Sequence, residues 1–269
     1  MHRILFQLGM FTVYSYGFML ALAFLVGTYL AQSRAGKQGI GPNIIMDLIF
    51  YILLSSIAGA RIFFVAVNWG YYRFHLADVF KVWEGGLVFY GGLVLALPAA
   101  FWFLKKNKLS FWKIADILSP SLAIGVALGR IGCFLNGCCY GKVSEVGGVC
   151  FPGAENPPVF AEQVFNGLIP PEARYSLPVI PTQVYESLSA VAIFLILVAL
   201  ERRKRFDGFI FLSFVLLYSL ARFVVEGFRY YEPNFILFGG LITVSQLISI
   251  ILAVVSGFLL IKGLAGLRK

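Results

Sequence analysis

The sequence predicts an all-α integral membrane protein whose helices cross the bilayer repeatedly. Hydrophobic residues make up 59% of the 269 residues and charged residues only 13%, which is too apolar for an ordinary soluble domain. Seven apolar runs reach the length that a helix needs to cross the hydrocarbon core. The basic residues form short clusters between these runs, as topology signals do. The formal charge of +9 therefore does not indicate nucleic-acid binding.

The seven runs are the predicted spans of a single integral membrane domain that covers residues 1–269. In chain order they are Val13–Ala31, Ile44–Val65, Leu87–Leu104, Ile114–Phe134, Thr182–Leu200, Phe209–Val225 and Leu241–Ile261. The first run is too long for the apolar part of a cleaved signal peptide, and its only upstream charge is Arg3. We therefore expect it to remain in the protein as a helix.

The basic residues set the expected orientation, because cytoplasmic loops carry an excess of Lys and Arg. One set of loops holds six of them: Arg3, Arg73, Lys81, Lys142, Arg174 and Arg229. The alternate set holds thirteen: Arg34, Lys37, Lys105, Lys106, Lys108, Lys113, Arg202, Arg203, Lys204, Arg205, Lys262, Arg268 and Lys269. The amino terminus is therefore expected outside the membrane and the carboxyl terminus in the cytoplasm.

Small and polar residues interrupt the first three runs. The first contains Tyr16-Gly17, the second contains Gly59-Ala60-Arg61, and the third begins in Gly85–Gly92, where two glycine pairs flank Tyr90. Polar groups inside a membrane usually serve function, but small residues also indicate close helix packing. A phenol is a poor general base, so a catalytic role and an interfacial anchor are both open for Tyr90.

The fourth run ends in the strongest polar signal, GRIGCFLNGCCYG, which covers Gly129–Gly141. Arg130 lies near the end of an apolar run, and Asn136 and several glycines follow it. Glycines allow backbone to approach a ligand closely. The pattern indicates a polar site at the membrane–water boundary that accepts an anionic group.

Cysteines are confined to this region of the chain. They are Cys133, Cys138, Cys139 and Cys150. No CxxC pairs with a second CxxC or with histidines, so their spacing does not favour a zinc site. We expect no metal and no cofactor, and we expect the cysteines to serve packing.

Two later spans carry further polar groups, and a loop precedes them. Residues 135–180 are rich in turn signals and are expected to form a small extracytoplasmic cap. Near the start of the fifth span, in PTQVYE, Gln183 and Glu186 are expected to face the bundle. In the sixth span Arg222, Glu226 and Arg229 are spaced by four and three, which puts them on one helix face.

Arg130 and Arg222 are the strongest candidates for a functional pair. Both lie near the outer ends of their spans, where two guanidiniums at one depth would bind a phosphate through paired hydrogen bonds. The alternative is that each extends to the interface or pairs locally, and Glu226 is the local partner open to Arg222. Arg229, further out, is expected to be screened by solvent.

In order and placement, these motifs resemble the bacterial prolipoprotein diacylglyceryl transferases. The resemblance covers nearly the whole chain. It is carried by Tyr16-Gly17, Gly59-Ala60-Arg61, GGLVFYGGL, GRIGCFLNGCCYG, PTQVYE, ARFVVEGFR and Thr243-Val244-Ser245-Gln246. It implies that Arg130 and Arg222 match the essential arginines, Gly141 the closing glycine, Glu226 the acid after the second arginine and Tyr16 an essential tyrosine.

The resemblance also implies an activity. Such an enzyme lies in the bacterial inner membrane and moves the diacylglyceryl group of phosphatidylglycerol to the lipobox cysteine thiol of a prolipoprotein. Glycerol phosphate leaves, and this is the first step of lipoprotein maturation. Catalytic roles are expected for Arg130, Arg222, Tyr90 and Glu226. Phospholipid contacts are expected for Arg130, Arg222, Tyr16, Asn136, Gly141, Arg61, Gln183, Tyr185 and Arg229.

Four positions depart from the family pattern. Tyr90 stands where many members have a histidine, Cys133 replaces a common asparagine, Cys138 a common glutamate, and Ile180 a histidine. A simple histidine base is thus not available at that position. Two other functions stay open: a membrane thiol–disulfide oxidoreductase that uses the cysteines, and a transporter of an anionic lipid whose path the arginines line.

Overall fold

A computed structural model describes residues 3–8, 11–82, 85–230, 236–237 and 242–266. Arg268 and Lys269, which the orientation argument counts, and Leu241, where the seventh run starts, lie outside the described residues. The chain divides into two compact units, which we describe separately. The first unit combines Met1–Leu30 with Ala115–Lys269, and the second is Ala31–Ile114.

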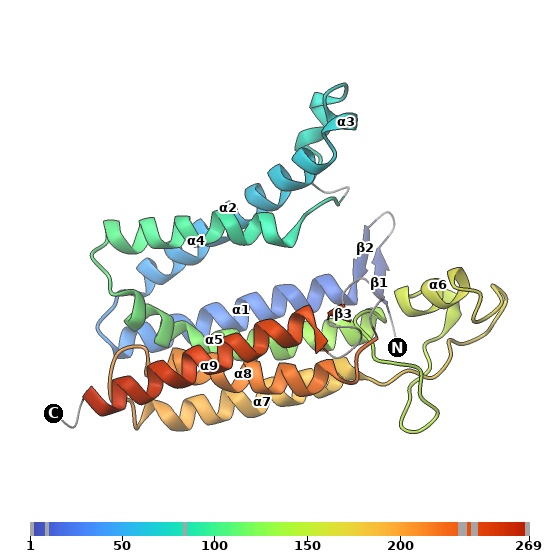
Figure 1. The fold of residues 1–269 in the computed structure, drawn as a ribbon. Helices are drawn as coiled ribbons and strands as arrows, with labels where there is room; N and C mark the ends of the chain where they lie inside the picture. The colour runs from blue at the N-terminus through green and yellow to red at the C-terminus, as the bar shows by residue number, and fades with distance from the viewer. Residues whose placement is uncertain (1–2, 9–10, 83–84, 231–235, 238–241, 267–269) are drawn as a thin grey trace. The chain divides into compact units, whose positions relative to one another are not determined.

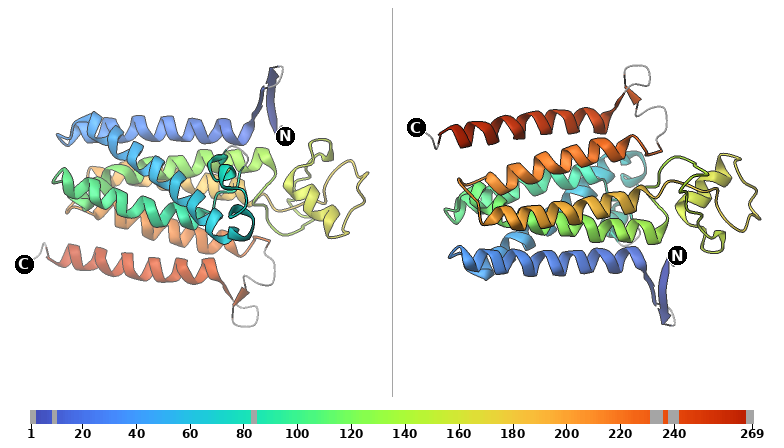
Figure 2. Two further views of the ribbon diagram at one scale, coloured as in Figure 1. Left: turned by 90° about the horizontal axis from the view of Figure 1, so that it is seen from above. Right: turned by 90° about the horizontal axis from the view of Figure 1, so that it is seen from below.

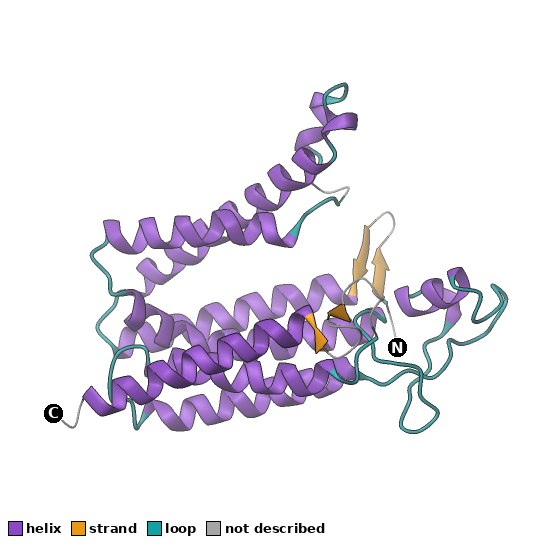
Figure 3. Cartoon of the chain, in the orientation of Figure 1, coloured by secondary structure: helices purple, strands orange, loops and turns teal. Residues whose placement is uncertain are grey.

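Helices dominate the described chain, as the sequence predicts (Figure 1 and Figure 3). The long helices are α1 (Ser15–Lys37), α2 (Pro42–Val67), α4 (Phe89–Lys106), α5 (Phe111–Asn136), α7 (Thr182–Glu201), α8 (Phe209–Glu226) and α9 (Val244–Gly266). Shorter ones are α3 (Trp69–Tyr72), α6 (Pro158–Phe165) and the 3₁₀ turns η1 (Leu76–Phe80) and η3 (Gly153–Glu155).

Two short antiparallel hairpins were not foreseen. Strands β1 (Ile4–Leu8) and β2 (Phe11–Tyr14) pair before α1, and β3 (Ile236–Leu237) and β4 (Ile242–Thr243) pair before α9. The first predicted span therefore begins two residues late, at Ser15, because Val13 and Tyr14 pair with the preceding strand. Alternating β-branched and aromatic residues such as those of β2 favour a strand.

Six helices are long and apolar enough to cross a membrane: α1, α2, α5, α7, α8 and α9. Each coincides with one of the expected runs. The remaining run folds as α4, an 18-residue helix that contains Pro98 and ends in Lys105 and Lys106. The described chain is thus an α-helical membrane protein with six candidate spans.

In the first unit, helices α5, α7, α8 and α9 run side by side (Figure 2). The core between α5, α7 and α8 is built on Ala123 of α5, Ile193 and Leu197 of α7 and Ile210 of α8, all buried. The Ser187 hydroxyl of α7 donates to the Ala127 carbonyl of α5 at 3.0 Å. Buried small and branched side chains thus let these helices approach closely, as membrane helices commonly do.

Residues 137–181 connect α5 to α7 and have a small core of their own. It consists of Tyr140, Phe151, Val159 and Val179. Val179 forms backbone bridges with both Val143 and Val149. In this segment, which the sequence predicts as a cap, burial and the hydrogen bond to Glu162 raise the pKa of Tyr140.

In the second unit, α2 and α4 pack against each other through glycines. A side chain on Gly59 would come within 2.9 Å of the Leu95 Cβ, and one on Gly92 within 2.9 Å of the Ser56 carbonyl oxygen. These residues belong to the two glycine motifs noted above. The interpretation of Gly59 and Gly92 as helix-packing residues is confirmed, because a larger side chain at either position would force α2 and α4 apart.

Candidate active site

Glu186 joins two arginines from neighbouring helices of the first unit. Its Oε2 pairs with Nε of Arg130 on α5, and its Oε1 pairs with Nη1 of Arg222 on α8. The Glu186 side chain, on α7, is only 8% exposed. One carboxylate thus fixes two guanidiniums with respect to each other, since an Arg–carboxylate contact is directional.

A second carboxylate, Glu226, holds Arg222 from the other side. Its Oε2 lies 2.8 Å from Nη2 of Arg222, so the local pair weighed from the sequence is present. Its Oε1 accepts a hydrogen bond from the Thr243 hydroxyl at 3.0 Å. The Glu226 side chain is fully buried, so these contacts offset the cost of removing its charge from water.

The TVSQ motif explains why Thr243 lies there. The Gln246 side chain accepts from the Thr243 backbone N–H at 3.0 Å, and the Gln246 N–H donates to the Thr243 hydroxyl oxygen at 3.1 Å. This reciprocal arrangement is a capping box at the start of α9. The motif therefore caps a helix and at the same time presents a hydroxyl to Glu226.

Arg229 departs from its sequence-based placement. Helix α8 ends at Glu226, so Arg229 lies in the turn that follows and not on the helix face. Its Nη1 is 3.9 Å from Oε1 of Glu186, and its side chain is 15% exposed, as is that of Arg222. The expectation that solvent screens Arg229 is wrong, because its side chain is mostly buried and lies near the Glu186 carboxylate.

Positive charge exceeds negative charge among the described residues of this cluster. The guanidiniums of Arg130, Arg222 and Arg229 lie near two carboxylates, those of Glu186 and Glu226, and all five side chains are mostly buried. Such an excess favours a bound anion, because the attraction is weakly screened there. The arrangement could therefore hold a phosphate.

Gly141 lies where three chain segments meet beside this cluster. Its N–H donates to the Ile180 carbonyl at 2.9 Å, and it forms a backbone bridge with Arg229. A Cβ at this position would come within 2.6 Å of the Phe228 carbonyl oxygen. Only glycine fits, so Gly141 sets the position of the Arg229 backbone.

The start of α7 fixes the turn after α5. The Gln183 side-chain amide donates to the Cys138 carbonyl at 2.7 Å, and the Thr182 hydroxyl donates to the Cys139 carbonyl at 2.9 Å. Both side chains are fully buried. Gln183 thus faces the bundle as expected, and its observed contact is with the loop backbone.

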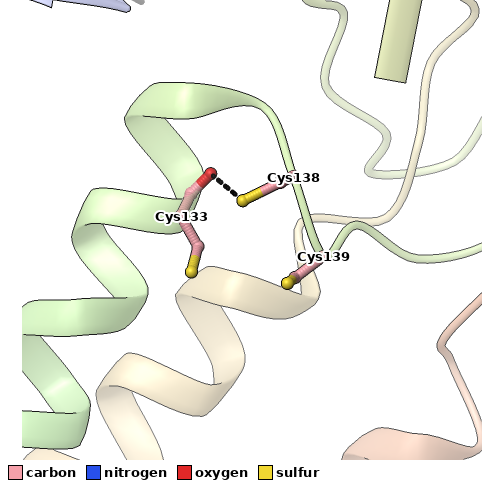
Figure 4. A group of neighbouring side chains, drawn as sticks. All are labelled: Cys133, Cys138 and Cys139. Atoms are coloured by element: carbon pink, nitrogen blue, oxygen red, sulfur yellow. Dashed lines mark hydrogen bonds between the residues drawn. The ribbon is translucent and has the colours of Figure 1, made fainter. Parts of the chain in front are cut away.

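Three cysteines gather in this turn (Figure 4). The sulfur atoms of Cys133, Cys138 and Cys139 all lie within 4.8 Å of one another. Hydrogen bonds with the other two thiols, together with the charges of Arg229 and Arg130, lower the pKa of the Cys139 thiol despite its burial. Cys150 is exposed and lies apart from this group in the sequence.

Other expected site residues of this unit lie at the same end of the helices. Tyr16, 40% exposed, packs against Gly132, where a Cβ would meet its Cδ2 at 3.4 Å. Asn136 is the last residue of α5, two residues before Cys138. Tyr185, 41% exposed, contacts Phe228 edge-on with ring centroids 6.4 Å apart.

Arg61 and Tyr90 belong to the second unit. The buried Arg61 donates to the backbone carbonyls of Asp78, Val79, Gly85 and Gly86 at 2.6 to 3.2 Å. These bonds give it a structural role in shaping the loop before α4. Tyr90, at the start of α4, is 69% exposed. Lipid contact by Arg61 and catalysis by Tyr90 stay predictions.

A cavity of about 250 Å³ lies in the first unit, between Arg3 and the segment of the chain that follows α5. Its lining includes Arg3, Leu135, Phe151 and Glu155. The Arg3 backbone N–H donates to the Glu155 carboxylate at 2.6 Å. None of the three clustered arginines lines this cavity, so it is distinct from the charged cluster.

Six candidate membrane spans and a charged cluster at one end of a helix bundle define a polytopic membrane protein with a polar centre. Residues 3–262 match the family model described as prolipoprotein diacylglyceryl transferase. The chain belongs to this family, and it is a transferase.

Relatives support the same assignment. The chain is 36% identical to the phosphatidylglycerol–prolipoprotein diacylglyceryl transferase of Listeria innocua, over 93% of this chain and 85% of the relative. It is 34% identical to the enzyme of that name from Bacillus velezensis, over 98% and 94% of the two chains. The corresponding enzyme of Thermosynechococcus vestitus is 35% identical over 83% and 80%.

Proposed function

We propose that this transferase moves the diacylglyceryl group of phosphatidylglycerol to the lipobox cysteine thiol of a prolipoprotein, the first step of bacterial lipoprotein maturation. The family match and the names of the relatives support it. The single observation that carries the mechanism is the joining of Arg130 and Arg222 through Glu186. This arrangement presents two oriented guanidiniums to one anionic group.

The reaction replaces a carbon–oxygen bond by a carbon–sulfur bond. The cysteine sulfur attacks the glyceryl carbon that carries the phosphoester oxygen, and glycerol phosphate leaves with the bonding electrons. Arg130 and Arg222 stabilise the charge that develops on the leaving phosphate. The thiol must lose its proton, since the thiolate is the nucleophile. Holding lipid and peptide together supplies much of the remaining acceleration.

The other residues have supporting roles. Glu186 and Glu226 orient the guanidiniums, and Arg229 adds positive charge. Tyr16, Asn136, Gly141, Gln183 and Tyr185 shape the surrounding lipid site, and Arg61 and Tyr90 contribute from the second unit. We take this chain to be a variant of the family in which Tyr90, Cys133 and Cys138 stand in place of a more usual histidine, asparagine and glutamate.

We further propose that α4 is a seventh span, that the protein lies in the bacterial inner membrane, and that residues 135–180 form an extracytoplasmic cap. The distribution of basic residues supports an outer amino terminus and a cytoplasmic carboxyl terminus. Reporter fusions after Lys108 and Arg205 should report cytoplasm, and a fusion after Glu155 should report the outside. The opposite pattern would reverse the orientation.

The activity is tested with purified protein, phosphatidylglycerol and a lipobox peptide. Mass spectrometry should show the peptide gaining one diacylglyceryl group, and a peptide with Ser in place of the lipobox Cys should gain none. Disulfide formation in the peptide without lipid transfer would support an oxidoreductase instead. Movement of lipid across a vesicle membrane with no modified peptide would support a transporter.

A further inference from the structure

The three clustered cysteines have no role in the mechanism proposed above. Cys133 lies in the last turns of α5, and Cys138 and Cys139 follow in the turn where the chain reverses. Gly137 makes this reversal with φ of 73°, and the Cys138 N–H donates to the Cys133 carbonyl at 3.1 Å. Figure 4 shows Cys133 on the helix and Cys138 and Cys139 on the segment that follows, with the Cys138 thiol donating to the Cys133 carbonyl oxygen at 3.7 Å.

The turn is also held in place from outside. Thr182 and Gln183 of α7 bind the carbonyls of Cys139 and Cys138. Cys139 itself has φ of 60°, a left-handed conformation that is uncommon for residues other than glycine. The sulfur atoms of Cys138 and Cys139 are therefore held by a fixed backbone segment, and the sulfur atom of Cys133 lies near them on α5. Fixed positions of this kind are typical of a preformed site.

The spacing of the sulfurs suits a thiophilic cation. With zinc–sulfur bonds of about 2.3 Å and tetrahedral angles, two thiolates on one zinc lie about 3.8 Å apart. The three sulfur atoms, all within 4.8 Å of one another, reach this spacing with small rotations of their side chains. Three protein ligands leave a fourth position open, which is typical of catalytic and not of structural zinc sites.

We propose that Cys133, Cys138 and Cys139 bind one divalent cation of the zinc class, and that its fourth position takes the thiolate of the substrate cysteine. The second half of this proposal rests on the proposed function. The substrate sulfur displaces a bound water and forms the fourth metal–sulfur bond, and its proton passes to solvent. A thiol bound to such a cation is deprotonated outright, which supplies the thiolate that the transfer needs.

The surrounding charge is compatible with such a centre. Three thiolates and one divalent cation carry a net charge of −1, and the three arginines and two carboxylates described above together carry +1. Arg130 precedes Cys133 by three residues, one helical turn along α5. The alkylated product is a thioether, which is a weaker ligand than a thiolate and would leave the cation readily.

The first test is the metal content of the purified full chain, prepared without chelators and under reducing conditions. Wild-type protein should carry about one zinc ion per chain, and Cys150→Ser, the matched control at an exposed thiol, should carry the same amount. Cys133→Ser, Cys138→Ser and Cys139→Ser should each lower zinc affinity at least tenfold. Thermal unfolding in detergent identifies any variant that does not fold. Equal affinity in all four variants, or a disulfide among the three cysteines of the reduced preparation, would overturn the proposal.

The second test uses cobalt in place of zinc, with no phospholipid present, so it does not depend on transfer. The cobalt protein should show thiolate-to-metal absorption, and a lipobox peptide should strengthen it whereas its Cys→Ser version should not. An unchanged spectrum with both peptides would exclude the open position as the thiol site. Transfer without bound metal would overturn the role of the metal in binding the substrate thiolate and leave the proposed function intact. Metal binding without any transfer would overturn the proposed function, and with it that role, and leave the metal site.

Discussion

Helix α8 has a buried carboxylate at each end, and the two differ in what compensates their charge. At its start, Asp116 of α5 accepts the backbone N–H groups of Gly208 and Phe211, both at 2.8 Å, and lies 3.0 Å from Nζ of Lys204. At its end, Glu226 binds Arg222 and Thr243, and Arg222 in turn binds Glu186.

The difference separates a carboxylate with a structural role from a cluster that is suited to bind a ligand. Asp116 meets a helix amino terminus, where the orphan N–H groups and the helix dipole stabilise an anion, and Lys204 completes the compensation. At the other end, within the part of the chain that the structure describes, three guanidiniums lie near only two carboxylates. A carboxylate whose charge is compensated holds helices together, whereas a cluster with excess positive charge is suited to an anionic ligand.

The largest effect is expected from Glu186→Gln. This change removes the charge that two buried guanidiniums share, and breaking a buried pair in this way destabilises by about 3–5 kcal/mol. We expect a lower melting temperature in detergent and little transfer to a lipobox peptide. Glu172→Gln, at an exposed residue of the cap, is the control and should change neither quantity. Wild-type stability of Glu186→Gln would refute the joining role.

The next effect is expected from Arg130→Lys and Arg222→Lys. Each keeps the charge but loses the planar fork, which should cost about 2–3 kcal/mol, or about a hundredfold in transfer rate. Arg174→Lys, at an exposed residue over the Tyr175 ring, makes the same chemical change away from the cluster and should leave the rate intact. Full activity of both cluster variants, at equal protein levels, would reduce the arginines to general charge attraction.

Asp116→Asn should lower the folding stability and leave the rate of transfer unchanged. The amide replaces one acceptor by a donor that faces the start of α8, which should cost about 1–3 kcal/mol of folding stability. Transfer per folded molecule should equal that of wild type. Asp207→Asn, which removes the exposed second partner of Lys204, should be nearly neutral. A fall in transfer rate without a fall in melting temperature would contradict the structural assignment of Asp116.

The sequence predicts the helices and both arginines of the pair because these signals are local. Apolar runs give the spans, and an arginine inside such a run is conspicuous. The sequence predicts that Glu186 faces the bundle, but it does not identify the partners of Glu186. These are Arg130 and Arg222, which lie 56 residues before it and 36 residues after it. Periodicity carries no information about which buried charges meet across helices.

The cysteines and Arg229 show the same limit of prediction from local sequence, here in the turns that follow helices. A search by spacing dismisses a metal site because it looks for paired CxxC motifs, whereas here the reversal at Gly137 brings Cys138 and Cys139 back toward Cys133. Arg229 was placed by helical spacing, but α8 ends at Glu226. Spacing rules hold within an element and fail where the element ends.

The smallest effect concerns the pH dependence at the start of α8. Hydrogen bonds with Asp207 and Asp116 raise the pKa of Lys204 against the opposing effect of its partial burial. A raised pKa in the folded state means that the stabilisation is fully present below the unfolded value, about 10.4, and is lost as pH rises through the folded value. The melting-temperature difference between wild type and Lys204→Met should therefore stay constant from about pH 6 to about pH 9 and shrink only at higher pH. A difference that changes near neutral pH would show that another group, and not the Lys204 ammonium, governs this end of the helix.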